Sequence, residues 1–247
     1  MAAIDERAID HIDFSAPLPE STEYERLHEW LVPEEWAGEH RQNADTQLGA
    51  YAAQHGLRAY QAAVSSGQYS RPTGLFFGGS KPTWSADSLR KILKDFLSPA
   101  VKRLAVLDIH TGLGPSGYGE PISLGSDTDV QRARQWYGPE VTNLAGDKSV
   151  SATVGGSVAD GLFSALPQTE ITYVALEFGT QPMQTVLNAL RADHWLHARP
   201  DRDTPLRASI NREMRDAFYV DDAAWKAAVS GRVADFTFRA ARALSTD

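Results

Sequence analysis

The chain has 247 residues, of which 42% are hydrophobic, and this is enough apolar material for the core of one large α/β domain. Its 24 Lys and Arg against 32 Asp and Glu give a net charge of −8, which disfavours a nucleic-acid partner because phosphate backbones are also negative. The absence of cysteine excludes disulfides, thiolate nucleophiles and Cys-type zinc sites. The opening MAAIDERAIDHIDFS has no apolar signal-peptide region, and no stretch approaches about 18 apolar residues, so we expect a cytoplasmic protein without a membrane partner.

The N-terminal part of the chain, residues 1–66, has a helical pattern. Apolar residues at Tyr24, Leu27 and Leu31 predict an amphipathic helix that begins at an N-cap on Ser21 or Thr22 and ends near Pro33. A longer helix is predicted over about 41–64, which Gly56 could interrupt.

The pattern changes to alternating helix and strand over residues 67–197. Leu104–Ile109 and Ile171–Phe178 are nearly continuous apolar runs, typical of strands buried on both faces. Helices are predicted over about 83–93 with Ser85 as N-cap, over 128–136 and 183–196, and a glycine-rich loop over 112–125. Two further helices, over about 205–218 and 221–244, fall in residues 198–247 and are expected to pack on this core. The prediction is a single α/β domain over 1–247, with a three-layer, partly parallel sheet flanked by helices.

Each of the two predicted strands has an ionisable residue at its carboxyl end. His110 follows Ile109, and Glu177 follows Leu176, and both precede loops that contain glycine. Functional side chains gather at the carboxyl ends of parallel strands. There an imidazole can bind zinc and a carboxylate can act as general base toward water. Alternatively, His110 bonds a backbone carbonyl and Glu177 caps a helix. Tyr118, in the adjacent loop, could orient a substrate or could pack in the core.

Several segments of the sequence, including those around His110 and Glu177, are similar to those of a known family. The segments are LDIHTGLGPSGYGE from Leu107 and YVALEFGT from Tyr173, with shorter ones at FSAPLPE, GQY, GGSKPTWS and RADHWLH. They resemble the zinc carboxypeptidase clan, in its bacterial branch near the aspartoacylase and succinylglutamate desuccinylase type. The resemblance implies that His110 is a zinc ligand and Glu177 the catalytic base. It also implies a hydrolase that cleaves peptides or acyl-amino acids with metal-activated water.

The chain departs from that pattern in its zinc ligands. The clan takes its first two ligands from a His-x-x-Glu motif, and none of the seven histidines here is followed three residues later by Glu. The resemblance therefore implies an incomplete, N-terminally truncated relative whose zinc site lacks two of its ligands. Three hypotheses remain: a zinc hydrolase completed by other ligands, a catalytically silent relative that acts as a binding module, and a plain α/β domain. An uncovered sheet edge would favour a homo-oligomer.

Overall fold

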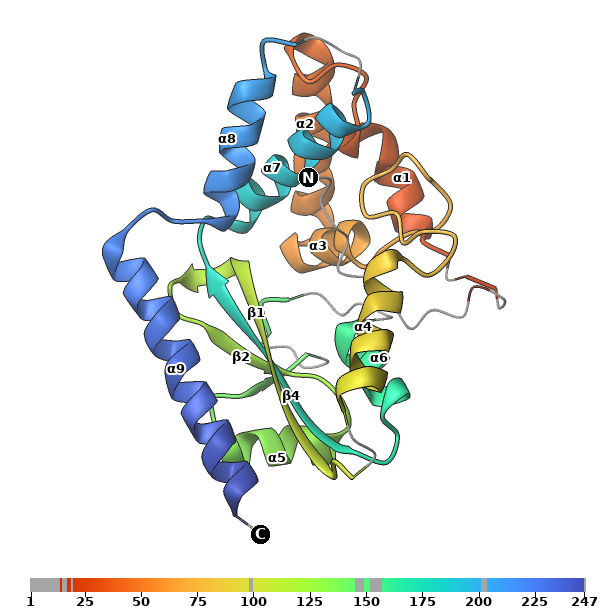
Figure 1. The fold of residues 1–247 in the computed structure, drawn as a ribbon. Helices are drawn as coiled ribbons and strands as arrows, with labels where there is room; N and C mark the ends of the chain where they lie inside the picture. Colours follow the sequence, from red (N-terminus) through yellow and green to blue (C-terminus); the bar gives the residue numbers. More distant parts are fainter. Residues whose placement is uncertain are drawn as a thin grey trace. The chain divides into compact units, whose positions relative to one another are not determined.

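The structure is a computed structural model, and it describes residues 14, 17–18, 20–97, 100–144, 149–151, 157–200 and 204–246. Figure 1 shows the elements found in these ranges. The helices are α1 Thr22–Leu31, α2 Gly38–His55, α3 Leu57–Ser65, α4 Trp84–Phe96, α5 Asp127–Tyr137, α6 Val158–Ala165, α7 Met183–His197, α8 Arg207–Phe218 and α9 Ala223–Ser245. The strands are β1 Arg103–Ser116, β2 Glu120–Ser123, β3 Thr142–Asn143 and β4 Glu170–Gly179. None of these helices combines the length and the apolar composition that crossing a bilayer requires.

The chain divides into two compact units, which we describe separately. The helical unit consists of Met1–Leu89, Ala152–Gly161 and Leu187–Met214. The sheet unit consists of Arg90–Ser151, Leu162–Val186 and Arg215–Asp247.

The helical unit begins with the amphipathic helix that the sequence predicts. Tyr24, Leu27 and Leu31 are all buried, and they pack in one cluster with side chains from α2 and α3. The long predicted helix is divided at Gly56, whose φ of 87° ends α2 and starts α3. The predicted interruption is confirmed.

A buried arginine connects the helices of this unit. Arg191 on α7 is 1% exposed and donates hydrogen bonds to the carbonyl oxygens of Trp30 and Leu31 at the end of α1, at 2.7 and 3.2 Å. It also donates to Asp45 Oδ1 on α2 at 2.8 Å and to Asn188 Oδ1 at 2.9 Å. All three nitrogens of the guanidinium therefore donate hydrogen bonds, and these bonds link α7 to α1 and α2.

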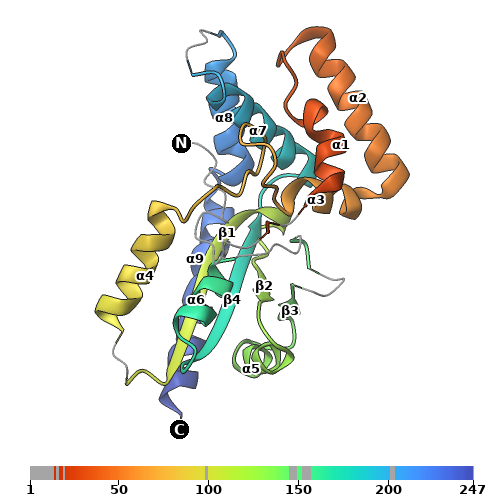
Figure 2. The ribbon, with the colours of Figure 1, turned by 90° about the vertical axis from the view of Figure 1, so that its right-hand side faces the viewer.

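The sheet unit holds a four-stranded sheet in the order β1-β4-β2-β3, whose strands Figure 2 shows side by side. β1 and β4 are parallel, β2 runs antiparallel to β4, and β3 is parallel to β2. The expected α/β class with a partly parallel, helix-flanked sheet is confirmed. The sequence did not predict α6, nor β2 and β3, which are short and lie in or just beyond glycine-rich sequence.

One face of the sheet is covered by α5 and α9. Val174, Leu176 and Phe178 of β4 are fully buried there against a cluster that includes Phe236 of α9 and Tyr137 of α5. The rings of Tyr137 and Phe236 are stacked, with centroids 4.8 Å apart. Alternate residues of β4 therefore face the other side of the sheet.

Three sequence predictions in this region are wrong. β1 is not buried on both faces: it is the outer strand among the described strands, and Ile109 is 44% exposed. Its pairing with β4 continues past Ile109, so His110 lies within the strand rather than after it. The cap of α4 is Thr83 rather than Ser85, because the Thr83 hydroxyl accepts a hydrogen bond from the Ala86 N–H.

Candidate active site

The backbone register brings His110 and Glu177 together. They are Cα partners on the adjacent parallel strands β1 and β4. Register partners project to the same face of a sheet, and this is the face opposite the α5–α9 cluster. Asp108 and Tyr173, each an even number of residues away on its strand, project to that face as well. We call these four residues the polar face of the sheet.

Asp108 orients the imidazole. His110 Nε2 lies 3.0 Å from Asp108 Oδ2, and the Tyr173 hydroxyl donates to the same oxygen. Burial by itself would raise the pKa of Asp108, but the hydrogen bond and charge of His110, together with the Tyr173 hydroxyl, outweigh it and hold that pKa below its usual value. Asp108 is thus a carboxylate that fixes the ring through Nε2 and turns Nδ1 away from itself.

The Glu177 side chain is held by the backbone of β1 just after the regular parallel pairing of β1 with β4 ends at Gly112. Its side chain is 9% exposed, and Oε1 accepts a hydrogen bond of 2.9 Å from the backbone N–H of Leu113. Gly112 lies beside this contact with a φ of 150°, and a Cβ there would crowd the Phe218 ring at 3.1 Å but would lie at an ordinary 3.6 Å from Oε1. A buried carboxylate with one oxygen anchored by a backbone donor is suited to a fixed proton acceptor.

The end of β4 is shaped by a close approach of two backbone segments. A Cβ on Gly179 would lie 2.0 Å from the carbonyl oxygen of Gly114, so only glycine fits. The Gly179 carbonyl oxygen accepts from Gly117 N–H and from Trp225 Nε1, both at 3.0 Å. The glycines that follow each candidate residue therefore fix the chain around the polar face.

A second buried glutamate lies on the polar face, and sequence reasoning did not single it out. Glu120 on β2 is the antiparallel partner of Glu177 and is 5% exposed. Its carboxylate accepts from Thr142 Oγ1 at 2.7 Å and from the Val150 N–H at 3.2 Å. His110, Glu177 and Glu120 thus form one row across β1, β4 and β2. In the sequence, the feature that could have drawn attention to Glu120 is its position directly after Tyr118 and Gly119 in the glycine-rich loop.

Tyr118, the predicted substrate contact, belongs to the turn that follows β1. It lies between β1 and β2, and its side chain is 49% exposed. The ring lies 5.9 Å from the guanidinium carbon of Arg232, which belongs to α9 on the opposite face of the sheet. The structure joins His110, Glu177 and Glu120 in one row and places Tyr118 beside α9.

A catalytic zinc takes about three protein ligands and one open position. The described residues contain no group of three His, Cys, Asp or Glu side chains able to hold a metal ion. His110 is the residue of the polar face that carries an imidazole, and Asp108 holds this ring through Nε2.

Fold and site together define a mixed α/β protein with an Asp-oriented imidazole and two buried carboxylates in register. A family model described as "Protein of unknown function (DUF2817)" matches residues 7–232, and the chain belongs to this family. No curated protein and no solved structure matches the chain.

Proposed function

We propose that this chain is a hydrolase of amide bonds, in peptides or acyl-amino acids, related to the zinc carboxypeptidase clan and acting in the cytoplasm. The observation that carries the proposal is the row of His110, Glu177 and Glu120 on one face of the sheet. The motifs around His110 and Glu177 supply the clan resemblance. Zinc is the cofactor we expect from that resemblance, with His110 as one ligand. The further ligands would come from residues outside the described ranges or from another chain.

The carboxylates supply the proton transfers that amide hydrolysis needs. Glu177 takes a proton from a water molecule as its oxygen attacks the carbonyl carbon, and passes that proton to the leaving nitrogen as the C–N bond breaks. Asp108 keeps the His110 ring in one orientation throughout.

Substitution of the proposed base tests this function. Glu177→Gln should lower hydrolysis of peptide or acyl-amino-acid substrates by at least about a hundredfold. The matched control is Glu170→Gln, the same change on the same strand at an exposed position, which should retain activity. Zinc content after dialysis, compared between wild type and His110→Ala, tests the metal ligand separately.

The results of these activity measurements distinguish a hydrolase from a binding module. Full activity in Glu177→Gln would show that Glu177 is not the base. Absence of hydrolysis by the wild-type chain, supplied with zinc and tested on both substrate classes, would favour the alternative of a catalytically silent relative.

A further inference from the structure

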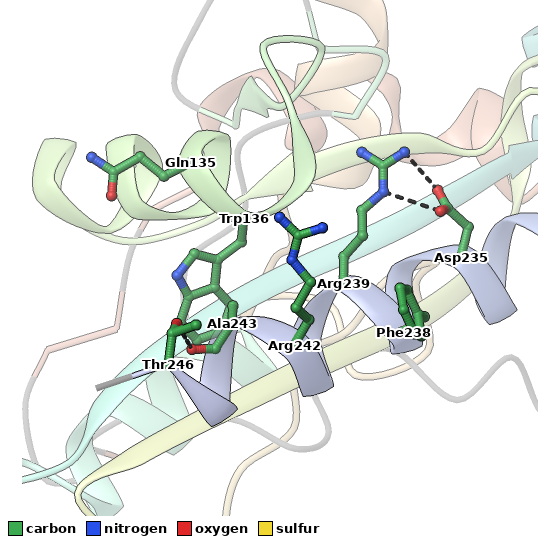
Figure 3. Close-up of a pocket in the computed structure, with 8 residues that line it drawn as sticks. All are labelled: Gln135, Trp136, Asp235, Phe238, Arg239, Arg242, Ala243 and Thr246. Atoms are coloured by element: carbon green, nitrogen blue, oxygen red, sulfur yellow. Dashed lines mark hydrogen bonds and ion pairs between the residues drawn. The ribbon is translucent and has the colours of Figure 1, made fainter.

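A hollow lies on the sheet unit between α5 and α9, away from the polar face. Its volume is about 530 Å³, within the range of small-molecule sites. Figure 3 shows its lining: Gln135, Trp136, Asp235, Phe238, Arg239, Arg242, Ala243 and Thr246. Because α5 and α9 cover the face of Val174 and Phe178, this hollow is separate from the row of His110, Glu177 and Glu120.

The charge of the hollow is positive in a protein of net charge −8. Arg239 is compensated, because its Nε and an Nη lie 3.1 and 2.9 Å from the two oxygens of Asp235. Arg242 makes no hydrogen bond or ion pair with the part of the chain that the structure describes, and Figure 3 draws its guanidinium on the same side of α9 as that of Arg239. The lining therefore contains one guanidinium with its five donors available to a ligand.

The negative end of α9 is itself neutralised. Arg103 on β1 donates to the carbonyl oxygens of Leu244 and Thr246, at 3.0 and 2.9 Å. Arg242 is thus not required to satisfy the last carbonyls of the helix, which is the usual structural role of a basic residue in a final turn.

Two aromatic side chains supply apolar surface beside this charge. Trp136 of α5 is partly buried, and Phe238 of α9 is 68% exposed. Both rings line the hollow together with Arg242. Flat apolar groups pack well against aromatic faces, and guanidinium groups bind carboxylate and phosphate in a bidentate manner.

We propose that this hollow binds a small organic anion composed of a flat apolar body and a carboxylate or phosphate group. Arg242 takes the anionic group, and Trp136 and Phe238 contact the body. The site is independent of the proposed hydrolase, because none of its residues belongs to the polar face.

Calorimetric titration of the full chain with three probes tests the site. Benzoate and phenyl phosphate should bind saturably, and whichever binds more tightly identifies the anionic group. Benzamide, the uncharged analogue of benzoate, should bind at least about tenfold more weakly because it cannot form the charge-assisted pair. Equal binding of benzamide and benzoate, or no saturable binding of either anion, would overturn the proposal.

Two variants assign the binding to the named residues. Arg242→Gln should weaken both anions at least about tenfold, whereas the matched control Arg212→Gln, at an exposed position on α8, should not. Phe238→Ala should weaken phenyl phosphate and leave inorganic phosphate unchanged. Wild-type affinity in Arg242→Gln, with helicity preserved by circular dichroism, would refute the site. Should that variant lose helicity, unchanged phenyl phosphate binding in Phe238→Ala would refute it instead.

Discussion

His110 on β1 and Glu177 on β4 are register partners, and the next partner across the sheet is Glu120. An imidazole and two carboxylates thus stand in one row on one face of the sheet, although they come from three separate strands. Rigid strands, rather than loops, hold all three Cα positions, so the spacing of the site is set by the sheet itself.

The close approach at the end of β4 predicts a strict need for glycine. Gly179→Ala should lower the free energy of unfolding by about 2 kcal/mol or more, because its Cβ would lie 2.0 Å from the Gly114 carbonyl oxygen. Gly231→Ala is the control: it lies in α9 with nothing within 4 Å of the added Cβ, and should raise stability by about 0.5–1 kcal/mol. Urea unfolding of both variants measures the difference, and equal effects would contradict the model of a backbone clash.

The buried arginine of the helical unit should be far more important for stability than a surface arginine. Arg191→Met removes donors from Asp45 and from two carbonyls at the end of α1, and should cost about 3 kcal/mol of unfolding free energy. Arg26→Met, which breaks an exposed pair with Glu23, should change it by less than about 1 kcal/mol. Thermal unfolding monitored by circular dichroism compares the two. A similar loss in both would show that the Arg191 contacts are not structural.

His194 should contribute to a dependence of stability on pH. Burial, reinforced by the nearby charges of Arg199 and His197, lowers the pKa of His194, and outweighs the hydrogen bond to the Thr73 carbonyl oxygen that raises it. With a folded-state pKa below the usual 6.5, its stabilising effect is complete above pH 6.5 and is lost as pH falls below that value.

The variant His194→Gln isolates this contribution. It should flatten the decrease in unfolding free energy between neutral pH and the acid range, as measured by urea titrations at successive pH values. A profile as steep as that of the wild type would assign the dependence to other groups.

Two buried tyrosines should respond oppositely to the same substitution. The Tyr137 hydroxyl is buried with no hydrogen-bond partner in the described structure, and burial raises its pKa to about 12. Tyr137→Phe should therefore be neutral or stabilise the fold by up to about 1 kcal/mol. Tyr173→Phe removes a donor from Asp108 and should destabilise by about 1–2 kcal/mol. Chemical denaturation measures both, and a loss of stability in Tyr137→Phe would reveal a missed partner.

Periodicity in the sequence was sufficient for the longer elements. The spacing of Tyr24, Leu27 and Leu31 predicted α1, because a helix with one buried face has apolar residues every three or four positions. The apolar run from Ile171 predicted β4, because a strand buried on both faces is apolar almost throughout. β2 and β3 have four and two residues, too few for any period to emerge. Their existence depends on pairing with a strand that comes later or earlier in the chain.

Dependence on pairing between distant segments also explains why the sequence did not identify Glu120 as a site residue. His110 and Glu177 stood out because each follows an apolar run. Glu120 follows glycines, and it becomes a site residue only through its pairing with Glu177, which sequence spacing does not reveal. The position of Tyr118 likewise depends on Arg232 of α9, more than a hundred residues later.

The strand order has a consequence for how the chain folds. β1 and β2 are consecutive in sequence, yet β4 is inserted between them, so the native sheet contains no β1–β2 hairpin. During synthesis, both strands must wait until residues 170–179 have left the ribosome before they gain their main partner. Such non-local pairing slows folding and prolongs the exposure of apolar strand edges, and we expect the nascent chain to depend on chaperones during that interval.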